Sequence, residues 1–434
     1  MARLNGEVGR TTGQLRLFAN VIREGSWVNA VIDTADATRT PARPDLRKMA
    51  LPLGPVAVFS ASNFPFAFST AGGDTASALA AGCTVVVKGH SAHQQTSQLV
   101  YEAIQKAIKS SGVPEFTMQH ITGPGNLVGK ALVQHPNITA VGFTGSFSGG
   151  TALVEYSSQR EVPVPVFAEM SSINPVVFFP DALEKNGAQL AQTYAGSITL
   201  GMGQFCTNPG LLLAVKSPAL DAFTGVLAEE IAKVAPAKML HTGICRSFNE
   251  KLEEVLEHKD VQLVKQSAQA PAELEAYPTL AKVSGAAFLA DAALKEEVFG
   301  PFSLLVECES KAELIKVLKS LKGQLTTTLM ATAEDIKANQ DLLDLQTTLA
   351  GRIILNGAPT GVEVCAAMVH GGPFPSTTDP RFTSVGSSAI QRWVRPVCFQ
   401  GFTEEMLPAE LKSANPLNIW RTVNNQFTQA PVSA

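Results

Sequence analysis

The sequence of 434 residues has few charged side chains, no long apolar run and no cysteine cluster. Charged residues make up 17% of it and the net charge is −4, without a basic stripe, so we expect no nucleic-acid partner. No run approaches the ~18 consecutive apolar residues of a membrane span, and the first residues lack the basic and apolar regions of a signal peptide. We therefore expect a protein that contacts neither nucleic acid nor membrane.

The six cysteines are scattered along the chain without a Cys-x-x-Cys pair. This spacing argues against a zinc ribbon and a disulfide framework, and it is typical of proteins of the reducing cytoplasm. His90 and His93 could share one helix face, but no nearby acid or thiol completes a set of ligands. We therefore predict no metal site.

Apolar residues make up 45% of the chain, and from residue 55 onward they form short strands separated by helical stretches. Continuous apolar strands between helices indicate a parallel sheet that is covered on both faces. The strands expected in the first unit are 56–60, 84–88, 119–122, 138–143 and 164–168. We predict a doubly wound, Rossmann-like α/β domain, with its ligand site at the carboxyl ends of the strands. A second α/β unit follows to about residue 355.

Polar side chains stand at the ends of the predicted strands or in the loops that follow them. Asn63 could donate a hydrogen bond to an oxyanion, although an ordinary turn would also suit it. Lys88 could hold a ribose hydroxyl or a phosphate. Glu169 has apolar neighbours that would raise its proton affinity and suit a general base, and Glu297 could bind ribose hydroxyls. A solvated surface position is the alternative for each glutamate.

Two glycine-containing segments complete the candidates. The run from Gly142 to Ser146 ends the fourth strand and opens a helix, so Ser146 is expected to cap it while free amides face a pyrophosphate. In the segment Gly201–Gly210, glycines would present Cys206 at the tip of a loop, where a thiolate can be reached. The alternative for Cys206 is a small buried apolar residue.

Taken in order, these motifs resemble those of the aldehyde dehydrogenases, and the resemblance covers the chain from about Gly9 to its last strand. The matching segments are Ser62–Pro65, Val87–Lys88, Gly142–Ser146, Glu169, Gly203–Cys206 and Glu297–Pro301. More narrowly, four segments look like the α-ketoglutaric semialdehyde (2,5-dioxopentanoate) dehydrogenase branch of that family: Gly9–Arg16, Phe167–Pro175, Gly203–Pro209 and His370–Pro375.

The resemblance implies a mechanism. The Cys206 thiolate attacks the aldehyde carbon, Asn63 and the Cys206 amide hold the oxyanion, and Glu169 activates water against the resulting thioester. It also implies a nicotinamide cofactor, with these binding residues: Lys88 and Ser91 on the adenosine ribose, Gly142, Thr144, Gly145 and Ser146 on the pyrophosphate, and Glu297 with Phe299 on the nicotinamide ribose.

Two departures from the commoner family pattern bear on this expectation. The residues after Glu169 are Met170, Ser171 and Ser172 in place of Leu-Gly-Gly. Ser91 stands where NAD-preferring members often carry a glutamate that repels a 2′-phosphate. We therefore predict use of NADP⁺, with NAD⁺ tolerated.

The expected reaction is oxidation of 2,5-dioxopentanoate to 2-oxoglutarate, with succinic semialdehyde or a fatty aldehyde as the alternative substrate. A semialdehyde acid needs a cation for its distal carboxylate, and Arg10 and Arg16 of the first helix are the candidates, with surface salt bridges as the other interpretation. Phe64 and Phe205 are expected beside the substrate.

The resemblance also divides the chain. It implies a cofactor-binding domain of residues 1–25 and 55–171, a catalytic domain of residues 172–387, an oligomerisation ribbon and strand of residues 26–54 and 388–402, and a C-terminal tail of residues 403–434. Pro396 confines the last strand to a sheet edge, and we expect a homodimer or a homotetramer. The chain is also expected to lack an N-terminal segment that family members have.

Two other functions remain open from the residues alone. One is a Cys/His hydrolase or acyltransferase that pairs Cys206 with His241 or His370 and needs no nicotinamide. The other is a catalytically impaired subunit of an oligomer, which would bind nucleotide without turnover.

Overall fold

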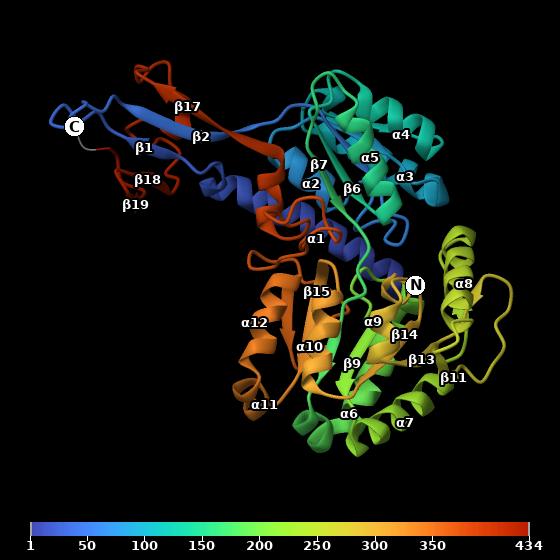
Figure 1. Ribbon diagram of the computed structural model, residues 1–434. Helices are drawn as coiled ribbons and strands as arrows, with labels where there is room; N and C mark the ends of the chain where they lie inside the picture. The colour runs from blue at the N-terminus through green and yellow to red at the C-terminus, as the bar shows by residue number, and fades with distance from the viewer. Residues whose placement is uncertain (1, 433–434) are drawn as a thin grey trace.

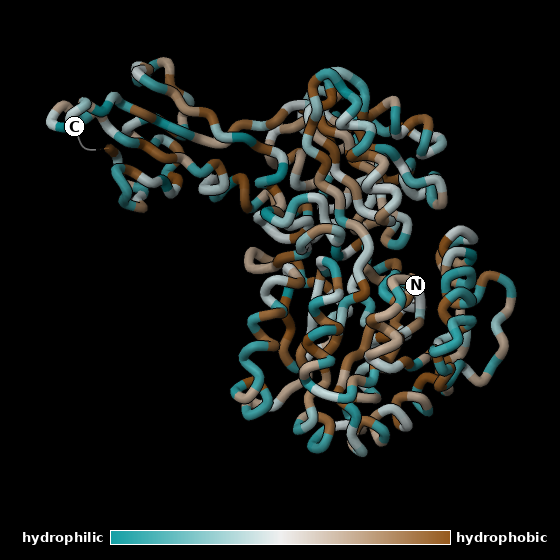
Figure 2. Tube along the Cα trace, in the orientation of Figure 1, coloured by the Kyte–Doolittle hydropathy of each residue, from teal (hydrophilic) through white to brown (hydrophobic). Residues whose placement is uncertain are grey.

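The computed structural model describes residues 2–432 and consists of two α/β domains and a projecting β sheet (Figure 1). We call these the first domain, the second domain and the extension sheet. Apolar segments follow the strands of both domains, whereas the outer helices alternate between apolar and polar residues (Figure 2). No helix among the described residues is both long and apolar enough to cross a membrane.

The first domain contains a five-stranded, entirely parallel sheet with the order β5-β4-β3-β6-β7. Its strands are β3 (Val56–Phe59), β4 (Val85–Lys88), β5 (Met118–Ile121), β6 (Ala140–Thr144) and β7 (Val166–Glu169). Helices α1 (Ala2–Glu24), α2 (Gly73–Ala80) and α3 (Gln94–Ser110) cover one face, and α4 (Gly125–Gln134) and α5 (Phe147–Ser158) cover the other. The predicted doubly wound sheet is confirmed, and its strand order reverses between β3 and β6, where such sheets bind ligands.

The second domain contains a seven-stranded sheet with the order β11-β13-β14-β9-β8-β15-β16, in which only β11 is antiparallel to its neighbour. Its strands are β8 (Val176–Phe178), β9 (Leu211–Val215), β11 (Gln262–Gln266), β13 (Thr279–Ser284), β14 (Phe302–Cys308), β15 (Gln324–Met330) and β16 (Ala350–Leu355). Helices α6 (Pro180–Thr199) and α7 (Pro218–Lys233) cover one face. The other face packs against α8 (Thr242–Leu256), α9 (Gly285–Ala290), α10 (Lys311–Ser320) and α12 (Gln340–Leu349).

The extension sheet has the order β17-β2-β1-β18-β19. Its strands are β1 (Val31–Asp33), β2 (Leu46–Pro52), β17 (Val394–Gln400), β18 (Arg421–Val423) and β19 (Gln426–Thr428). The prediction that Pro396 lies in an edge strand is confirmed, because β17 pairs only with β2.

The sequence led us to expect a separate tail over residues 403–434, but the described residues of this segment contradict that expectation. Their described part returns to the extension sheet, where β18 pairs in parallel with β1. The buried Arg421 side chain donates to the carbonyl oxygens of Glu410 and Lys412, so it anchors this segment from within. The family resemblance implied the tail, and it carried no information on the long-range pairing of β18 with β1.

Candidate active site

Cys206 lies in a tightly constrained loop that begins where α6 ends. Gly201, Met202 and Gly203 all adopt left-handed backbone conformations, with φ of 56°, 56° and 61°. A Cβ at Gly203 would overlap the carbonyl of Gly300, so only glycine lets the loop approach the 297–301 turn. The Cys206 side chain is half-buried at the end of this turn, as the glycine-flanked position predicts.

Asn174 fixes the loop from below, and the sequence analysis did not identify it. Its Nδ2 donates to the carbonyl oxygens of Cys206 and Asn208, each at 2.9 Å. Its Oδ1 accepts from the Thr326 hydroxyl at 3.0 Å, and its own φ of 50° is left-handed. An asparagine tolerates this conformation better than most residues. Its place between Ile173 and Pro175 was the sequence feature that could have identified it.

Cys206, His370 and Glu169 meet in one buried cluster. His370 Nε2 lies 3.2 Å from Cys206 Sγ and 3.0 Å from Glu169 Oε1. The Ser384 hydroxyl donates to Glu169 Oε2 at 2.7 Å, while His370 Nδ1 is buried without a partner. A nucleophile, a carboxylate and an imidazole therefore share one site.

The electrostatics of this cluster correct one expectation. We expected apolar surroundings to raise the proton affinity of Glu169, and burial does raise its pKa. The charge of His370 and hydrogen bonds from His370 and Ser384 outweigh burial, however, so the pKa of Glu169 lies below its usual value. Burial lowers the pKa of His370, but Glu169 and Cys206 more than reverse this, and its pKa lies well above the usual value. At neutral pH, Glu169 is therefore ionised and His370 is protonated.

His370 reaches this position because its segment runs along the end of β7. The Met170 amide donates to the Ser376 carbonyl at 2.8 Å, and the Thr378 amide donates to the Ala168 carbonyl at 3.1 Å. A Cβ at Gly372 would overlap the Gln324 carbonyl, so a glycine is required two residues after His370. The sequence analysis named His370 only for a hydrolase, and the structure places it beside the thiol.

Asn63, which follows β3, comes to the same loop as predicted. Its Nδ2 donates to the carbonyl of Gln204 at 3.3 Å, two residues before Cys206. A primary amide has two N–H donors, so one remains to face a group bound at the sulfur. Asn63, Glu169 and Cys206 thus come from three different elements.

Aromatic and cationic side chains surround the sulfur on the α1 side. The Phe64 and Phe205 rings meet edge to face at 5.2 Å, and the Arg10 guanidinium lies 5.1 Å from the Phe68 ring centroid. Nε and Nη2 of Arg10 are buried without hydrogen-bond partners. Burial lowers the pKa of Arg10 while Cys206, Glu169 and Glu363 raise it, so all three lie within electrostatic reach.

Arg352 is a second cation that sequence reasoning missed. It extends from β16, and its pKa is lowered by burial and raised by Cys206. It donates to the carbonyls of Gly361 and Pro359, and its buried Nε has no partner. Arg16 behaves differently from Arg10, because it is exposed on α1 and no described contact links it to the site. The prediction for Arg16 therefore finds no support in its position.

Several of the predicted cofactor residues lie together at the carboxyl edge of the first sheet. Ser146 caps α5 by accepting from the Gly149 amide at 3.1 Å, as predicted, and the exposed residues 145–148 leave that helix end open. Lys88 ends β4, and burial lowers its pKa, while Ser91 is exposed in the turn after it. A helix start and an ammonium at one edge fit an anionic nucleotide.

Gly142 does not lie at the carboxyl edge of the first sheet. It lies inside β6, where a Cβ would come within 2.7 Å of the Trp393 ring. Its lack of a side chain therefore serves packing against Trp393. Thr144, by contrast, ends the strand and is half-buried, immediately before Gly145 and Ser146.

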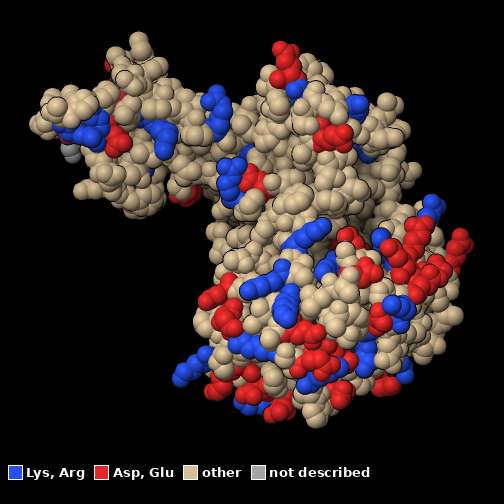
Figure 3. Space-filling view, viewed as in Figure 1, with Lys and Arg blue, Asp and Glu red and all other residues tan. Residues whose placement is uncertain are grey.

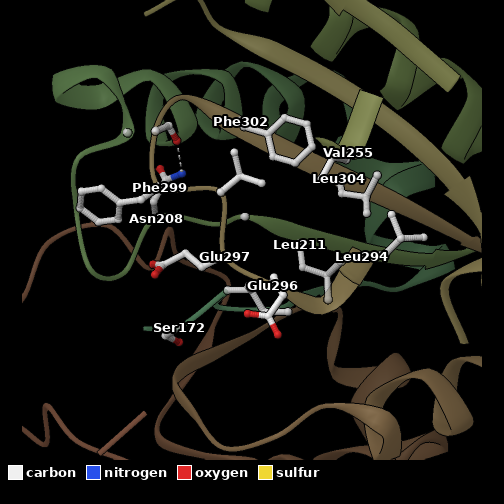
Figure 4. Close-up of a pocket in the computed structure, with 15 residues that line it drawn as sticks. Ser172, Asn208, Leu211, Val255, Leu294, Glu296, Glu297, Phe299, Phe302 and Leu304 are labelled. Carbon is white, nitrogen blue, oxygen red and sulfur yellow. Dashed lines mark hydrogen bonds between the residues drawn. The ribbon is translucent and has the colours of Figure 1, made fainter. Parts of the chain in front are cut away.

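Glu297 and Phe299 line a pocket in the second domain, between the Cys206 loop and the strands β9 and β14 (Figure 4). Figure 4 shows the Glu297 carboxylate on the side of Ser172, whereas Leu211 and Leu294 form the apolar side. The Asn208 amide donates to the Gly300 carbonyl at 3.1 Å, which holds the 297–301 turn against the loop. Burial raises the pKa of Glu297 to about 7.

An adjoining cavity is lined by Phe147, Ser171 and Glu297, so it extends from the start of α5 to the Glu297 carboxylate. An extended dinucleotide needs such a path between a helix N-terminus and the nucleophile, and the residues present fit one. On the face shown in Figure 3, acidic and basic side chains are interspersed over the second domain and are sparser on the first.

Known proteins resemble this chain in both sequence and fold. The model of the aldehyde dehydrogenase family matches residues 1–393. Alpha-ketoglutaric semialdehyde dehydrogenase 2 of Azospirillum brasilense is 51% identical over 97% of this chain and 80% of its own length. An alpha-ketoglutaric semialdehyde dehydrogenase of Acinetobacter baylyi is 48% identical over 99% of this chain and 82% of its own length.

Among solved structures, the NADP complex of the glyceraldehyde-3-phosphate dehydrogenase GapN from Methanocaldococcus jannaschii is similar with a TM-score of 0.75. It is 20% identical, and the match covers 91% of this chain and 81% of that one. The gamma-glutamyl-gamma-aminobutyraldehyde dehydrogenase of Burkholderia cenocepacia is similar with a TM-score of 0.73 at 21% identity, over 91% of this chain and 76% of that one.

Proposed function

The chain belongs to the aldehyde dehydrogenase family, and from that premise we propose that it oxidises 2,5-dioxopentanoate to 2-oxoglutarate. One observation in the site carries the substrate: the partnerless Arg10 guanidinium lies within electrostatic reach of Cys206. A buried cation with free N–H donors matches the distal carboxylate of a semialdehyde acid. The names of the two relatives that are about half identical to this chain support the same substrate.

The side chains divide the chemistry among them. Protonated His370, 3.2 Å from the sulfur, favours the Cys206 thiolate, which attacks the aldehyde carbon to give a thiohemiacetal. The Asn63 amide and the Cys206 backbone N–H hold the oxyanion. A nicotinamide held by Glu297 and the start of α5 would supply the hydride acceptor for this oxidation. Ionised Glu169 then takes a proton from water as its oxygen attacks the thioester carbon; the carbon–sulfur bond breaks, and the acid and the Cys206 thiolate are released.

The carboxylate of the substrate would lie between Arg10 and Arg352. The two arginines come from different domains, α1 and β16, and burial lowers the pKa of both while the charge of Cys206 partly offsets this. Arg10 is the freer of the two, because Arg352 already donates to two backbone carbonyls. The Phe68 ring centroid lies 5.1 Å from the Arg10 guanidinium carbon, within the range of a cation–π contact.

For the cofactor we propose NADP⁺, with NAD⁺ as a slower alternative. Ser91 is exposed after the end of β4 and places a hydroxyl, without a carboxylate, beside Lys88. A 2′-phosphate at this point meets a cation and a donor and no like charge. Lys88 and Ser91 would hold the adenosine ribose, the start of α5 the pyrophosphate, and Glu297 the nicotinamide ribose.

The test compares three aldehydes, each with NADP⁺ and with NAD⁺, by the absorbance of reduced nicotinamide. We expect the highest kcat/KM for 2,5-dioxopentanoate, a lower value for succinic semialdehyde and the lowest for a long-chain aldehyde, each higher with NADP⁺. Equal kcat/KM for the long-chain aldehyde would contradict the substrate, and a clear NAD⁺ preference would contradict the cofactor. Cys206→Ala should abolish the signal with every pair.

Arg10→Gln isolates the carboxylate contact. A charge-assisted hydrogen bond contributes about 1.5–3 kcal/mol, so KM for 2,5-dioxopentanoate should rise about 10- to 100-fold while KM for an uncharged aldehyde changes little. Arg16→Gln, a loss of the same charge from an exposed position on the same helix, is the matched control and should leave both values unchanged. Equal effects of Arg10→Gln on both aldehydes would point to a structural role.

The contact between Cys206 and His370 also favours a second candidate, a hydrolase that forms a thioester without nicotinamide. Such an enzyme would cleave activated esters at the same rate with or without NADP⁺ and would not oxidise aldehydes. The assay above separates the two.

We further propose a homodimer or homotetramer of a cytoplasmic enzyme. The extension sheet has two unpaired edges, β17 and β19, which can pair with another copy. All six cysteines are free, which suits a reducing compartment.

A further inference from the structure

Cys206, Glu169 and His370 have a property that aldehyde oxidation does not use. One ligand atom from each residue, a thiol sulfur, a carboxylate oxygen and an imidazole nitrogen, lies within 4.8 Å of the other two. Each of these groups is a ligand that zinc accepts in proteins. No other group of three such residues occurs among residues 2–432, and His90 and His93 are not part of this one.

The spacing of the three atoms is close to that of a tetrahedral zinc site. Bonds of about 2.0–2.3 Å at tetrahedral angles separate neighbouring ligand atoms by roughly 3.3–3.6 Å. His370 Nε2 is 3.2 Å from Cys206 Sγ and 3.0 Å from Glu169 Oε1, so these two separations need to lengthen by only a few tenths of an ångström. The sulfur and the carboxylate oxygen lie within 4.8 Å of each other, and side-chain rotation would bring them to the same ion. The metal would take the place of the proton on Nε2.

The ligand types suit a divalent ion. Zinc binding releases the protons on the sulfur and on Nε2 to solvent, and the thiolate and the carboxylate then balance the metal charge. Thiolate and imidazole ligands select Zn²⁺ over Mg²⁺ or Ca²⁺, which prefer oxygen.

We propose that this cluster is a Zn²⁺ site whose occupation reversibly inhibits the enzyme. This regulation rests on the proposed function, since it removes the nucleophile and the base of the oxidation together. Coordination draws charge from the sulfur and lowers its nucleophilicity toward the aldehyde carbon, and a coordinated Glu169 is a weaker base toward water.

The structure also limits the affinity of the cluster for Zn²⁺. Zinc-binding histidines usually donate their other ring N–H to a carboxylate or a carbonyl, and loss of that partner lowers affinity about 10- to 100-fold. His370 Nδ1 has no such partner. We therefore expect an inhibitory site that a chelator empties readily, in contrast to a structural zinc site.

The test measures metal binding in the absence of aldehyde and cofactor. Co²⁺ titrated into the full chain should bind at one ion per chain, with a thiolate-to-cobalt charge-transfer band that added Zn²⁺ removes. His370→Asn and Glu169→Gln should each weaken Co²⁺ at least ~10-fold, and Cys206→Ser should remove the charge-transfer band. Cys398→Ser and His241→Asn remove a thiol and an imidazole outside the cluster and should change nothing.

Site-resolved alkylation gives a second measurement that does not depend on the variants. Zn²⁺ should slow iodoacetamide labelling of Cys206 several-fold, leave labelling of exposed Cys398 unchanged, and lose its effect when a chelator is added. An unchanged Cys206 rate in excess Zn²⁺, or a charge-transfer band that survives Cys206→Ser, would overturn the site. Metal binding without any aldehyde turnover would instead contradict the proposed function and leave the site in place.

Discussion

Glu169 is fully buried, yet it lies between a protonated imidazole and a hydroxyl that both favour its charged form. Because its folded pKa is lowered, Glu169 stabilises the protein above its ordinary pKa, and this contribution is lost as pH falls through the lowered value. The pKa of His370 is raised, so its contribution is complete below its ordinary pKa and is lost as pH rises through the raised value. The pair is therefore intact across neutral pH.

Glu297 yields a prediction about pH at the residue scale. Burial raises its pKa to about 7, so the carboxylate gains a proton as pH falls below that value and becomes a weaker acceptor for ribose hydroxyls. We expect the Kd of the nicotinamide cofactor to rise as pH falls from about one unit above this pKa to about one unit below it. Fluorescence titration of the cofactor-binding equilibrium at each pH measures the change.

Two variants of adjacent glutamates check that assignment. Glu297→Gln should flatten the pH profile of the cofactor Kd, because the amide does not titrate. Glu296→Gln changes the exposed neighbour and should keep the wild-type profile. A profile that persists in Glu297→Gln would place the titrating group elsewhere.

At the scale of elements, the Cys206 loop depends on one side chain from outside it. Asn174→Gly keeps a residue that accepts the left-handed φ but removes the donors to the Cys206 and Asn208 carbonyls. An unsatisfied buried carbonyl costs about 1–3 kcal/mol, so we expect Tm to fall by several degrees and kcat of the folded enzyme to fall with it. Thermal unfolding and initial rates measure the two effects.

Asn356→Gly is the matched control for that variant. Asn356 also has a left-handed φ, 53°, and its side chain pairs with the Ala331 amide and carbonyl in the same domain, outside the Cys206 loop. Its loss should lower Tm while kcat of the folded enzyme stays unchanged. Equal kcat losses in the two variants would mean that Asn174 acts only through global stability.

At the scale of the whole molecule, the extension sheet carries exposed apolar rings away from both domains. Trp420 and Phe427 stack at 4.8 Å on its β18–β19 side, and Phe427 is 68% exposed. We expect light scattering to show a dimer or a tetramer, and we expect Phe427→Glu to lower the assembly state or weaken it at low protein concentration. Leu127→Glu, an exposed leucine on α4, should leave the assembly unchanged. A monomeric wild-type protein would exclude the proposed assembly.

Local patterns were sufficient for much of the fold and part of the site. Each strand of the first sheet lies within two residues of its expected position, since continuous apolar segments between helices have few other structures available. Ser146 caps its helix and Pro396 lies at a sheet edge for equally local reasons. Asn63, Glu169 and Cys206 could be selected because each follows a strand or a glycine turn.

Contacts between distant segments decided the rest. His370 is 164 residues from Cys206, and only the pairing of its segment with the end of β7 brings the imidazole to the sulfur. Arg10 and Arg16 are equivalent by composition, but the helical turn directs one toward Cys206 and the other to the surface. The lowered pKa of Glu169 depends on those same contacts, which reverse the effect of its apolar neighbours.

By itself, then, the sequence determined the strands, the helix caps and the family motifs, because these depend on neighbours within a few residues. Only the tertiary structure decided which histidine faces the thiol, which arginine lies within electrostatic reach of Cys206 and where residues 403–432 pack. Those outcomes depend on side chains and backbone groups that the folded sheets bring together from opposite ends of the chain.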